Sequence, residues 1–452
     1  MATFVCQECG AILPKWMGQC DVCKAWNCII EEVSVNKKTR KQVNISEDFF
    51  VSLANYEYIR SDTANLQRHK TLLNEFNRVL GGGFVDGSVV LLGGPPGIGK
   101  STILLQALSE ISGVENFVYI SAEESIKQVM MRAERLNINN AKLKVASSLD
   151  IQQILNSVNE MMGNGILVVD SIQTISSELV QSPPGSISQV RFCTQELVNF
   201  AKSNDVIVVI VGHITKDGII AGPKTLEHMV DCVLYFEGDK SYNYRILRGE
   251  KNRYGPTDEI GVFLMTNSGL EEVSNPSSVF LSEYSSDVSG VAVFSGIEGT
   301  RPILSEVQAL VSNTNMAIPK RSSVGFDANR LSMLVAVLSS CCKVDFSHKD
   351  IYVNIAGGLK VTEPAIDLAV IAAILSSAFK KPLPKEAIFF GEVNLSGEIR
   401  QANLPFPRIK EAQKLGFTKI FCPHKTDDFE KLGKLHVNKL KSIKEILALV
   451  KK

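Results

Sequence analysis

Gly94-Pro95-Pro96-Gly97-Ile98-Gly99-Lys100-Ser101-Thr102 contains the spacing Gly-x-x-x-x-Gly-Lys-Ser. In this pattern the glycines let backbone N–H groups turn inward around phosphate oxygens at the start of a helix. The apolar run Val89 to Leu92 precedes the motif, and a segment with helical spacing follows it. The sequence therefore predicts a phosphate-binding loop (P-loop) between a strand and a helix, inside an α/β nucleotide-binding domain.

Each side chain of this loop and its partners has an expected task. Lys100 would reach the β- and γ-phosphates of ATP, and the Ser101 hydroxyl would ligate Mg²⁺. The apolar strand Ile166 to Val169 ends at Asp170, which suits a carboxylate that reaches Mg²⁺ directly or through water; an Asp that merely caps the strand end is the alternative. The expected nucleotide-binding residues are Gly94, Pro95, Pro96, Gly97, Ile98, Gly99, Lys100, Ser101, Thr102, Asp170 and His213.

Acidic and imidazole groups follow two further strands. Glu123 and Glu124 come after Phe117 to Ile120, so we expect them at the sheet edge that carries the phosphates. We favour Glu123 as the general base; alternatively both acids only favour the positive end of a helix dipole. His213 follows the strand Val206 to Val211, where it would serve either as a γ-phosphate sensor or as a structural histidine.

Strand-like and helical segments alternate from about residue 56 to residue 273, as in a mostly parallel sheet flanked by helices. After Asp231 the rhythm changes to strands joined by short turns, which we interpret as an antiparallel extension of the sheet. The predicted strands are Val89 to Leu92, Phe117 to Ile120, Leu143 to Ala146, Ile166 to Val169, Val206 to Val211, Val233 to Glu237, Tyr244 to Leu247 and Val262 to Thr266.

The N-terminal segment carries two Cys-x-x-Cys pairs, Cys6/Cys9 and Cys20/Cys23. Two such pairs complete a tetrahedral four-sulfur zinc site, and a segment this short needs the metal in order to fold. A redox dithiol or chance spacing are the alternatives. We interpret Cys28 as a packing residue beside Trp26.

The turn-rich stretch Ser274 to Ser278 predicts a domain boundary, and the mixture of strands and helices after it indicates an α+β domain. From Arg400 to Lys452 there are 13 basic and 5 acidic side chains, which indicates either a contact with an anionic partner or a solvated helical face. The expected divisions are a zinc-binding domain at 1–30, a linker at 31–55, an ATPase domain at 56–275 and a C-terminal domain at 276–452.

Composition supports a folded protein of several domains. The 452 residues are 45% apolar, and 48 basic minus 48 acidic side chains gives a net charge of 0, so bulk charge indicates no particular partner. The longest apolar stretch, Leu368 to Phe379, has about 12 residues, fewer than the roughly 20 that a membrane-spanning helix needs. With no secretory signal in Met1 to Cys9, we expect a cytoplasmic protein.

The four-cysteine segment, the P-loop, the run Gly212 to Asp231 and Lys251-Asn252-Arg253-Tyr254-Gly255 together resemble the bacterial RadA (Sms) family of RecA-like DNA repair ATPases, over essentially the whole chain. Tyr254 stands where that family has Phe. The resemblance implies that Glu123 is the catalytic glutamate. It also implies that Lys251 and Arg253 reach the ATP of a neighbouring subunit in a ring, by resemblance a hexamer; a local ion-pair role is the alternative.

The same resemblance implies the function. It indicates a DNA-dependent ATPase, using ATP, Mg²⁺ and Zn²⁺, that acts in homologous recombination and repair on single-stranded and branched DNA, with recombinase or replication-fork proteins as partners. The segments Ser177 to Ser188 and Thr215 to Lys224 would be its DNA loops. A protein-remodelling ATPase and a regulatory nucleotide switch remain as alternative classes.

The C-terminal domain resembles the Lon protease domain, which uses a Ser nucleophile activated by a Lys. Here Ala365 stands at the nucleophile position. The segment Asn403 to Arg408 falls where the Lys belongs, with Phe406 as the nearest match. We therefore expect a domain that does not cleave peptides and serves as an assembly scaffold.

Overall fold

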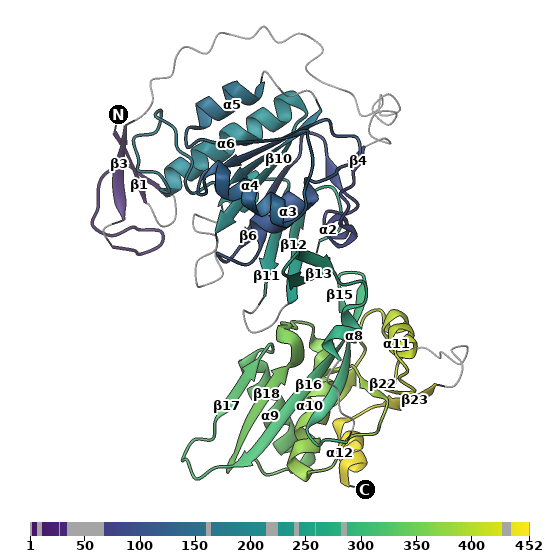
Figure 1. The fold of residues 1–452 in the computed structure, drawn as a ribbon. Coiled ribbons are helices and arrows are strands. Elements are labelled where there is room, and N and C mark those ends of the chain that lie inside the picture. Colours follow the sequence, from purple (N-terminus) through teal and green to yellow (C-terminus); the bar gives the residue numbers. More distant parts are fainter. Residues whose placement is uncertain are drawn as a thin grey trace, which may run out of the picture. The chain divides into compact units, whose positions relative to one another are not determined.

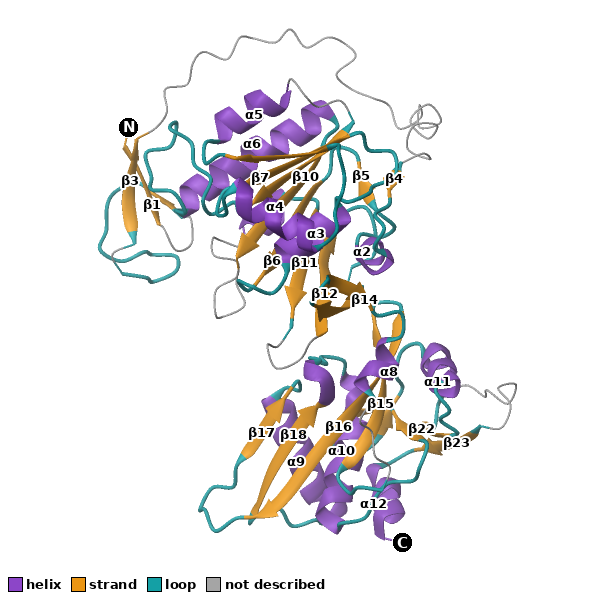
Figure 2. Cartoon of the chain, in the orientation of Figure 1, coloured by secondary structure: helices purple, strands orange, loops and turns teal. Residues whose placement is uncertain are grey.

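A computed structural model describes residues 2–6, 11–26, 28–33, 67–159, 164–213, 225–238, 244–257, 259–281, 287–426 and 435–451 (Figure 1). The chain forms two compact units, one of residues 1–237 and 245–272 and the other of residues 238–244 and 273–452. Both units contain helices and strands (Figure 2). None of the helices in the described ranges is long and apolar enough to cross a membrane.

The N-terminal segment is a small antiparallel sheet of order β2-β1-β3. Its strands are β1 (Ala2–Cys6), β2 (Ile12–Leu13) and β3 (Ile29–Val33). Val33 pairs with Ala2, so the sheet continues past residue 30, where we expected the linker to begin. Cys6, Cys20 and Cys28 are buried with Leu13 and Ile29, so sulfur atoms supply much of this small core.

The rest of the first unit is built on a nine-stranded sheet of order β14-β13-β12-β11-β6-β10-β9-β7-β8. Strands β6 to β10 are mutually parallel, and the prediction of a mostly parallel sheet is confirmed. The strands are β6 (Val89–Gly94), β7 (Asn116–Ser121), β8 (Leu143–Ser147), β9 (Gly165–Asp170), β10 (Ile207–His213), β11 (Cys232–Glu237), β12 (Tyr244–Asn252), β13 (Ile260–Thr266) and β14 (Gly269–Glu272).

The prediction for β11 was wrong in one respect. We expected an antiparallel extension to begin there, but β11 runs parallel to β6, with Val233 opposite Leu91. Antiparallel pairing begins only between β11 and β12. The helix α7 (Thr225–Met229) lies between β10 and β11 and gives the chain its crossover back to the same end of the sheet.

Helices cover both faces of this sheet (Figure 2). Alternate residues of β6 point to opposite faces: Val90 and Leu92 join one buried cluster, and Val89 and Leu91 join the other. The first cluster includes α2 (Asn74–Val79), α3 (Lys100–Ala107) and α4 (Ile126–Arg135), and the second includes α5 (Ile151–Asn159), α6 (Ile187–Asn204) and α7. A separate two-stranded sheet pairs β4 (Arg68–His69) with β5 (Phe84–Val85).

The second unit is an α+β domain with a seven-stranded sheet of order β17-β18-β16-β15-β19-β22-β23. Its strands are β15 (Val291–Glu298), β16 (Arg301–Asn313), β17 (Arg321–Val324), β18 (Lys349–Ile355), β19 (Ala387–Phe389), β22 (Lys419–Pro423) and β23 (His436–Leu440), with a separate pair β20 (Glu392–Val393) and β21 (Ile399–Arg400). Its helices are α8 (Pro276–Phe280), α9 (Ala328–Cys342), η3 (Ala356–Gly358), η4 (Pro364–Ile366), α10 (Asp367–Phe379), α11 (Pro405–Lys414) and α12 (Ile443–Lys451).

The central helix of this unit is α10, which is buried from Asp367 to Ser376. Its first residue is a carboxylate with no exposed surface, and Arg330 of α9 binds it through Nε at 2.9 Å and through Nη2 at 2.5 Å. The backbone N–H of Val393 donates to the same carboxylate at 3.0 Å. Burial raises the pKa of Asp367 in spite of these bonds, and the buried pair joins α9 to α10.

Candidate functional site

The P-loop turns between β6 and α3, and its lysine folds back over it. Lys100 Nζ donates to the carbonyl oxygens of Gly94 at 2.7 Å and Pro95 at 3.0 Å. Gly99 has φ +119°, a value that L side chains rarely adopt. A Cβ at Gly94 would lie 2.7 Å from the carbonyl oxygen of Phe236 in β11. Strand β11 therefore packs directly against the start of the loop and leaves no room for a side chain at residue 94.

Ser101 and Asp170 lie side by side, as their proposed role at one metal ion requires. Ser101 Oγ donates to Asp170 Oδ2 at 2.6 Å. The buried hydroxyl of Tyr119, in the neighbouring strand β7, donates to the same oxygen at 2.5 Å. Hydroxyl and carboxylate oxygens are the ligands that Mg²⁺ prefers, so this donor set fits the ion.

Glu123 lies at the same edge, where it contacts the last residue of β10 and the residue that follows β9. His213 Nε2 is 2.8 Å from Glu123 Oε1, and Ser171 Oγ donates to the same oxygen. His213 Nδ1 is 3.2 Å from Lys100 Nζ. Since His213 pairs with Gly94 across β10 and β6, the imidazole stands beside the start of the P-loop.

The ionisation of this cluster follows from its contacts. Burial lowers the pKa of Lys100, although Asp170 and Glu123 act against that shift. Burial acts to raise the pKa of Glu123, but the hydrogen bonds from Ser171 and His213, with the charge of Lys100, outweigh it and hold this pKa below its usual value. Glu123 is therefore a carboxylate at neutral pH, the form that a general base needs.

Glu124 is engaged elsewhere. Both of its carboxylate oxygens accept from Arg132 of α4, at 2.7 Å each. Ser125 begins that helix through a capping box with Gln128. Of the two acids, Glu123 is therefore the one at the P-loop: it contacts His213, which lies beside Lys100.

Lys251 and Arg253 do not join this cluster in their own chain. Lys251 Nζ donates to the carbonyl oxygens of Glu227 at 2.7 Å and Val230 at 2.8 Å, at the end of α7. Arg253 Nη1 donates to the buried carboxylate of Asp231 at 3.1 Å. Lys251 lies opposite Val233, which pairs with Leu91, so both cations stand toward the end of β6 away from its P-loop.

Of the two expected DNA loops, Thr215 to Lys224 lies outside the described residues. The other, Ser177 to Ser188, is held by the buried side chain of Gln189 in α6. Its Nε2 donates to the carbonyl oxygens of Ser177, Val180 and Ser182 at 3.1, 2.9 and 2.9 Å, and its Oε1 accepts from Ser177 N at 2.9 Å. The last two residues of the expected loop, 187 and 188, belong to α6.

Three of the four predicted zinc ligands, Cys6, Cys20 and Cys23, lie together, and Cys9 lies outside the described residues. The sulfur atoms of Cys6, Cys20 and Cys23 all lie within 4.8 Å of one another, and three thiols in this arrangement fit a zinc ion. Cys28, which we interpreted as a packing residue, places its Sγ 3.4 Å from Cys6 Sγ.

In the C-terminal unit Ala365 is buried, so a methyl group occupies the expected nucleophile position. Phe406, the nearest match to the catalytic lysine, lies in the first turn of α11 and is exposed. The cation of this segment is instead Arg408, which has no exposed surface. It binds Glu363 through both terminal nitrogens and donates to Ser295 O at 2.6 Å.

Sequence reasoning missed Tyr119, Ser171 and Gln189 as parts of the candidate site. Tyr119 looks like an ordinary strand residue, and nothing in its neighbourhood marks a contact with an acid 51 residues away. Ser171 follows Asp170 directly, so its position after the metal-side carboxylate was a usable signal. Gln189 carried no signal, because a polar residue in a helix is usually exposed.

Three families match parts of the chain: "AAA domain" over residues 61–218, "Subunit ChlI of Mg-chelatase" over 307–426 and "Rubredoxin metal binding domain" over 4–31. Among solved structures, the RadB recombinase is 22% identical with a TM-score of 0.37, covering 45% of this chain and 98% of that one. A KaiC-like protein from the archaeon Pyrococcus horikoshii is 18% identical with a TM-score of 0.38, covering 46% of this chain and 99% of that one.

The full-length relatives are closer. The DNA repair protein RadA of Rickettsia conorii is 47% identical over 450 residues, 99% of each chain. That of Bacillus subtilis is 48% identical over 421 residues, 93% of this chain and 92% of the other. The match to the Rickettsia protein spans 450 residues and so includes the cysteine-rich N-terminal segment, the P-loop domain and the C-terminal domain, and the chain belongs to the RadA family of DNA repair proteins.

Proposed function

We propose that this protein is a DNA-dependent ATPase of recombination and repair. The observation that carries the proposal is the meeting of Lys100, Ser101, Asp170 and Glu123 at one edge of the sheet. Lys100 would bind the phosphates, and Glu123 would accept a proton from the attacking water. Ser101 and Asp170 would hold Mg²⁺, which when bound neutralises charge on the β- and γ-phosphates.

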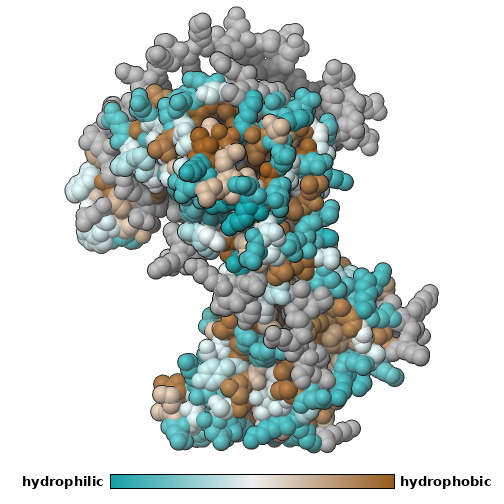
Figure 3. All heavy atoms as spheres, viewed as in Figure 1, coloured by the Kyte–Doolittle hydropathy of each residue, from teal (hydrophilic) through white to brown (hydrophobic). Residues whose placement is uncertain are grey.

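Hydrolysis would be completed by a neighbouring subunit. Lys251 and Arg253 stand away from their own P-loop, and Arg253 is 55% exposed at its side chain. A cation presented in trans can stabilise transition-state charge on phosphate. The exposed apolar side chains Ile126, Met130 and Met131 on α4 support subunit contact, and Figure 3 shows apolar atoms on this face. We infer a ring, by family resemblance a hexamer.

The DNA would be bound by the loop Ser177 to Ser188, which Gln189 holds through hydrogen bonds, together with Thr215 to Lys224. ATP turnover would change the contacts between subunits and thereby move the DNA. Binding through backbone charge gives weak sequence preference and an affinity that falls with salt. The substrates would be single-stranded and branched DNA in the cytoplasm, with recombinase or replication-fork proteins as partners. With Ala365 at the nucleophile position, the C-terminal domain would not cleave peptides.

The deciding measurement is the steady-state ATPase rate with and without single-stranded DNA, at low and high salt, beside Lys100→Ala. DNA stimulation that fades with salt, and loss of turnover in the variant, are expected. Turnover that DNA does not change would favour a protein-remodelling ATPase, and nucleotide binding without turnover would favour a regulatory switch. Retained turnover in Lys100→Ala would overturn the assignment of the P-loop.

A subunit-mixing experiment tests the roles in trans. Arg253→Ala and Glu123→Gln should each abolish most hydrolysis while nucleotide binding remains. In mixed rings, some interfaces pair an intact Glu123 site with an intact Arg253, so part of the activity should return. No recovery over any mixing ratio would assign Arg253 to its ion pair with Asp231 alone.

A further inference from the structure

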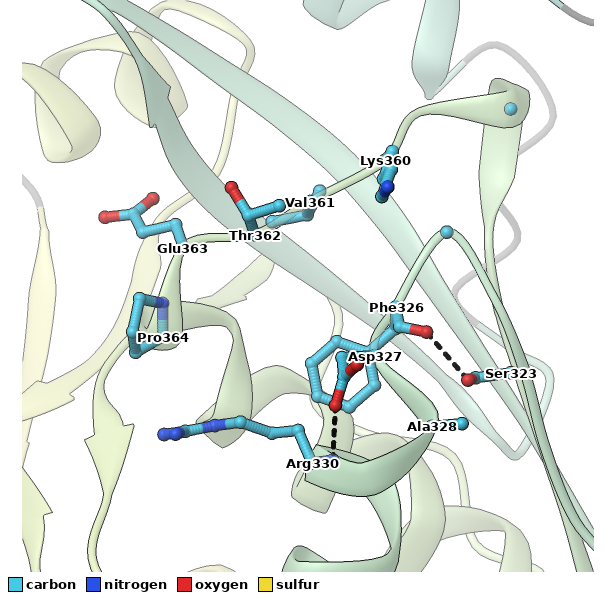
Figure 4. Close-up of a pocket in the computed structure, with 12 residues that line it drawn as sticks. Ser323, Phe326, Asp327, Ala328, Arg330, Lys360, Val361, Thr362, Glu363 and Pro364 are labelled. Atoms are coloured by element: carbon cyan, nitrogen blue, oxygen red, sulfur yellow. Dashed lines mark hydrogen bonds between the residues drawn. The ribbon is translucent and has the colours of Figure 1, made fainter. Parts of the chain in front are cut away.

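The C-terminal unit contains a cavity of about 580 Å³ at the end of strand β17 (Figure 4). One wall is the turn after β17 and the start of α9, with Phe326 and Asp327. The facing wall is the segment before α10, with Lys360, Val361 and Thr362. Ligand sites in proteins have volumes of about 300 to 1,000 Å³, so this cavity is large enough to receive part of another molecule.

The cavity continues from an open sheet edge. Within the described part of the unit, β17 has β18 on one side and no strand on the other. Ile351 of β18 donates its N–H to the carbonyl oxygen of Lys320. Because backbone groups alternate in direction along a strand, those of Arg321 and Ser323 turn toward the open side. This edge therefore offers main-chain donors and acceptors to an added strand.

The edge lacks the protection that charged side chains usually give. The Arg321 guanidinium donates to the carbonyl oxygens of Phe346, at 3.0 Å, and Lys349, so it is held on the β18 side. The Ser323 hydroxyl donates to the carbonyl oxygen of Phe326 at 2.7 Å. Both side chains are tied to their own unit, and neither blocks the open backbone.

The cavity begins where this edge ends. Gly325 is the next residue that turns to the open side, and its carbonyl oxygen already accepts from Val361 N at 2.9 Å. Leu359, two residues before Val361, has an extended backbone, with φ −70° and ψ 133°. A strand that paired with Arg321 and Ser323 would therefore meet the wall of the cavity where it came level with Gly325.

The charges around the cavity leave one cation available. Arg330 is occupied by Asp367, and Glu363 by Arg408. The Asp327 carboxylate caps α9 by accepting from the backbone N–H of Arg330 at 2.7 Å. Lys360 is exposed and has no ion-pair partner among the residues that the structure describes. The rest of the lining includes the apolar side chains of Phe326, Val361 and Pro364.

We propose that β17 and this cavity bind an extended peptide segment of a partner protein, which adds a strand at Arg321 and Ser323. An apolar side chain of the peptide enters the cavity, and a neighbouring Asp or Glu pairs with Lys360. Main-chain hydrogen bonds supply affinity and the cavity supplies specificity, as in other cases of strand addition. Since Ala365 offers no nucleophile, the peptide is held intact.

The test uses the full-length protein and a fluorescein-labelled peptide of about eight residues in which Val or Phe alternates with Thr or Glu. Fluorescence anisotropy gives its Kd. Ser323→Pro removes an outward N–H without touching the ladder to β18, and Ser323→Ala is the matched control that keeps it. We expect Ser323→Pro to weaken binding about three- to tenfold and Ser323→Ala less than about twofold.

Lys360→Glu tests the charge and does not depend on the strand edge. It should weaken binding of the Glu-containing peptide and strengthen binding of a version with Lys in place of Glu, while the ATPase rate stays unchanged. Equal Kd values for the peptide and a Pro-interrupted version, or for the wild type and a folded Ser323→Pro, would overturn the proposal. A further outcome would also overturn the proposal: oligo-dT displaces the peptide, and Ser323→Pro does not change the Kd of the peptide. That result would assign the surface to nucleic acid.

Discussion

In the ATPase domain one imidazole connects Lys100 to Glu123: His213 Nδ1 lies 3.2 Å from Lys100 Nζ, and His213 Nε2 lies 2.8 Å from Glu123 Oε1. An ammonium group only donates, so Nδ1 accepts and Nε2–H donates to the carboxylate. His213 thereby connects the group expected to bind phosphate with the group expected to accept the proton. We expect a change in the charge or position of one of these groups to affect the other through His213.

Replacing His213 tests this link. His213→Ala removes the donor to Glu123 but leaves Lys100 bound to Gly94 and Pro95. We expect ATP affinity to remain within about threefold, and kcat to fall about 10- to 100-fold, the loss of one hydrogen bond to a charged group. Steady-state kinetics and nucleotide titration measure both, with the exposed His436→Ala as control. An unchanged kcat would make His213 a purely structural residue.

The Ser171 hydroxyl should set the pH at which the candidate base works. It is one of the groups that hold the pKa of Glu123 below its usual value, so Ser171→Ala should raise that pKa. A larger fraction of Glu123 is then protonated at a given acidic pH, and the acid limb of the kcat profile should move to higher pH. Ser171→Thr keeps the hydroxyl and should keep the wild-type profile. The same acid limb in Ser171→Ala and the wild type would contradict the role.

Two glycines of the P-loop should differ in how they tolerate a methyl group. A Cβ at Gly94 would lie 2.7 Å from the Phe236 carbonyl oxygen, whereas nothing lies within 4 Å of a Cβ at Gly97. Gly97→Ala meets only the strain of φ +75°, roughly 1 to 2 kcal/mol. Gly94→Ala should abolish ATP binding, while Gly97→Ala should reduce affinity about tenfold. Comparable affinities for the two variants would contradict the close contact with β11.

Much of the site could be predicted because its residues follow strands. Lys100, Glu123, Asp170 and His213 come at the ends of β6, β7, β9 and β10, and parallel strands end at one edge. What could not be predicted depends on side chains that cross between elements. The donation of Tyr119 to Asp170 is one such contact, and the burial of Arg408 against Glu363 is another.

The direction of β11 could not be predicted for a related reason. Its sequence, Cys232 to Glu237, is an apolar run that suits either direction, and only the path of the chain after His213 decides it. The edge strand β17 was missed because its four residues, Arg-Ser-Ser-Val, carry no alternating apolar pattern. Such a strand is specified by its neighbour β18 and by the turn at Gly325.

The loop Ser177 to Ser186 should lose its shape without Gln189. Gln189→Met removes four hydrogen bonds and leaves buried backbone groups unpaired, which we expect to lower the free energy of unfolding by roughly 2 to 4 kcal/mol. Gln195→Met, on the same helix but exposed, is the control. Urea unfolding measures the loss, and DNA stimulation of the ATPase should fall more than the basal rate. Equal loss of both rates would remove the reason to assign this loop to DNA.

The metal content of cysteine variants tests which thiols bind zinc. Cys6, Cys20 and Cys23 bring their sulfur atoms within 4.8 Å of one another, and we expect Cys9 to be the fourth ligand. Cys20→Ser should therefore lose the metal, about one zinc per chain, and unfold the N-terminal sheet. Cys28→Ser should keep it, although Cys28 Sγ is 3.4 Å from Cys6 Sγ. Metal analysis after dialysis, with the circular dichroism of each variant, gives the comparison. Zinc lost from Cys28→Ser but retained in a Cys9→Ser variant would show that Cys28, not Cys9, completes the site.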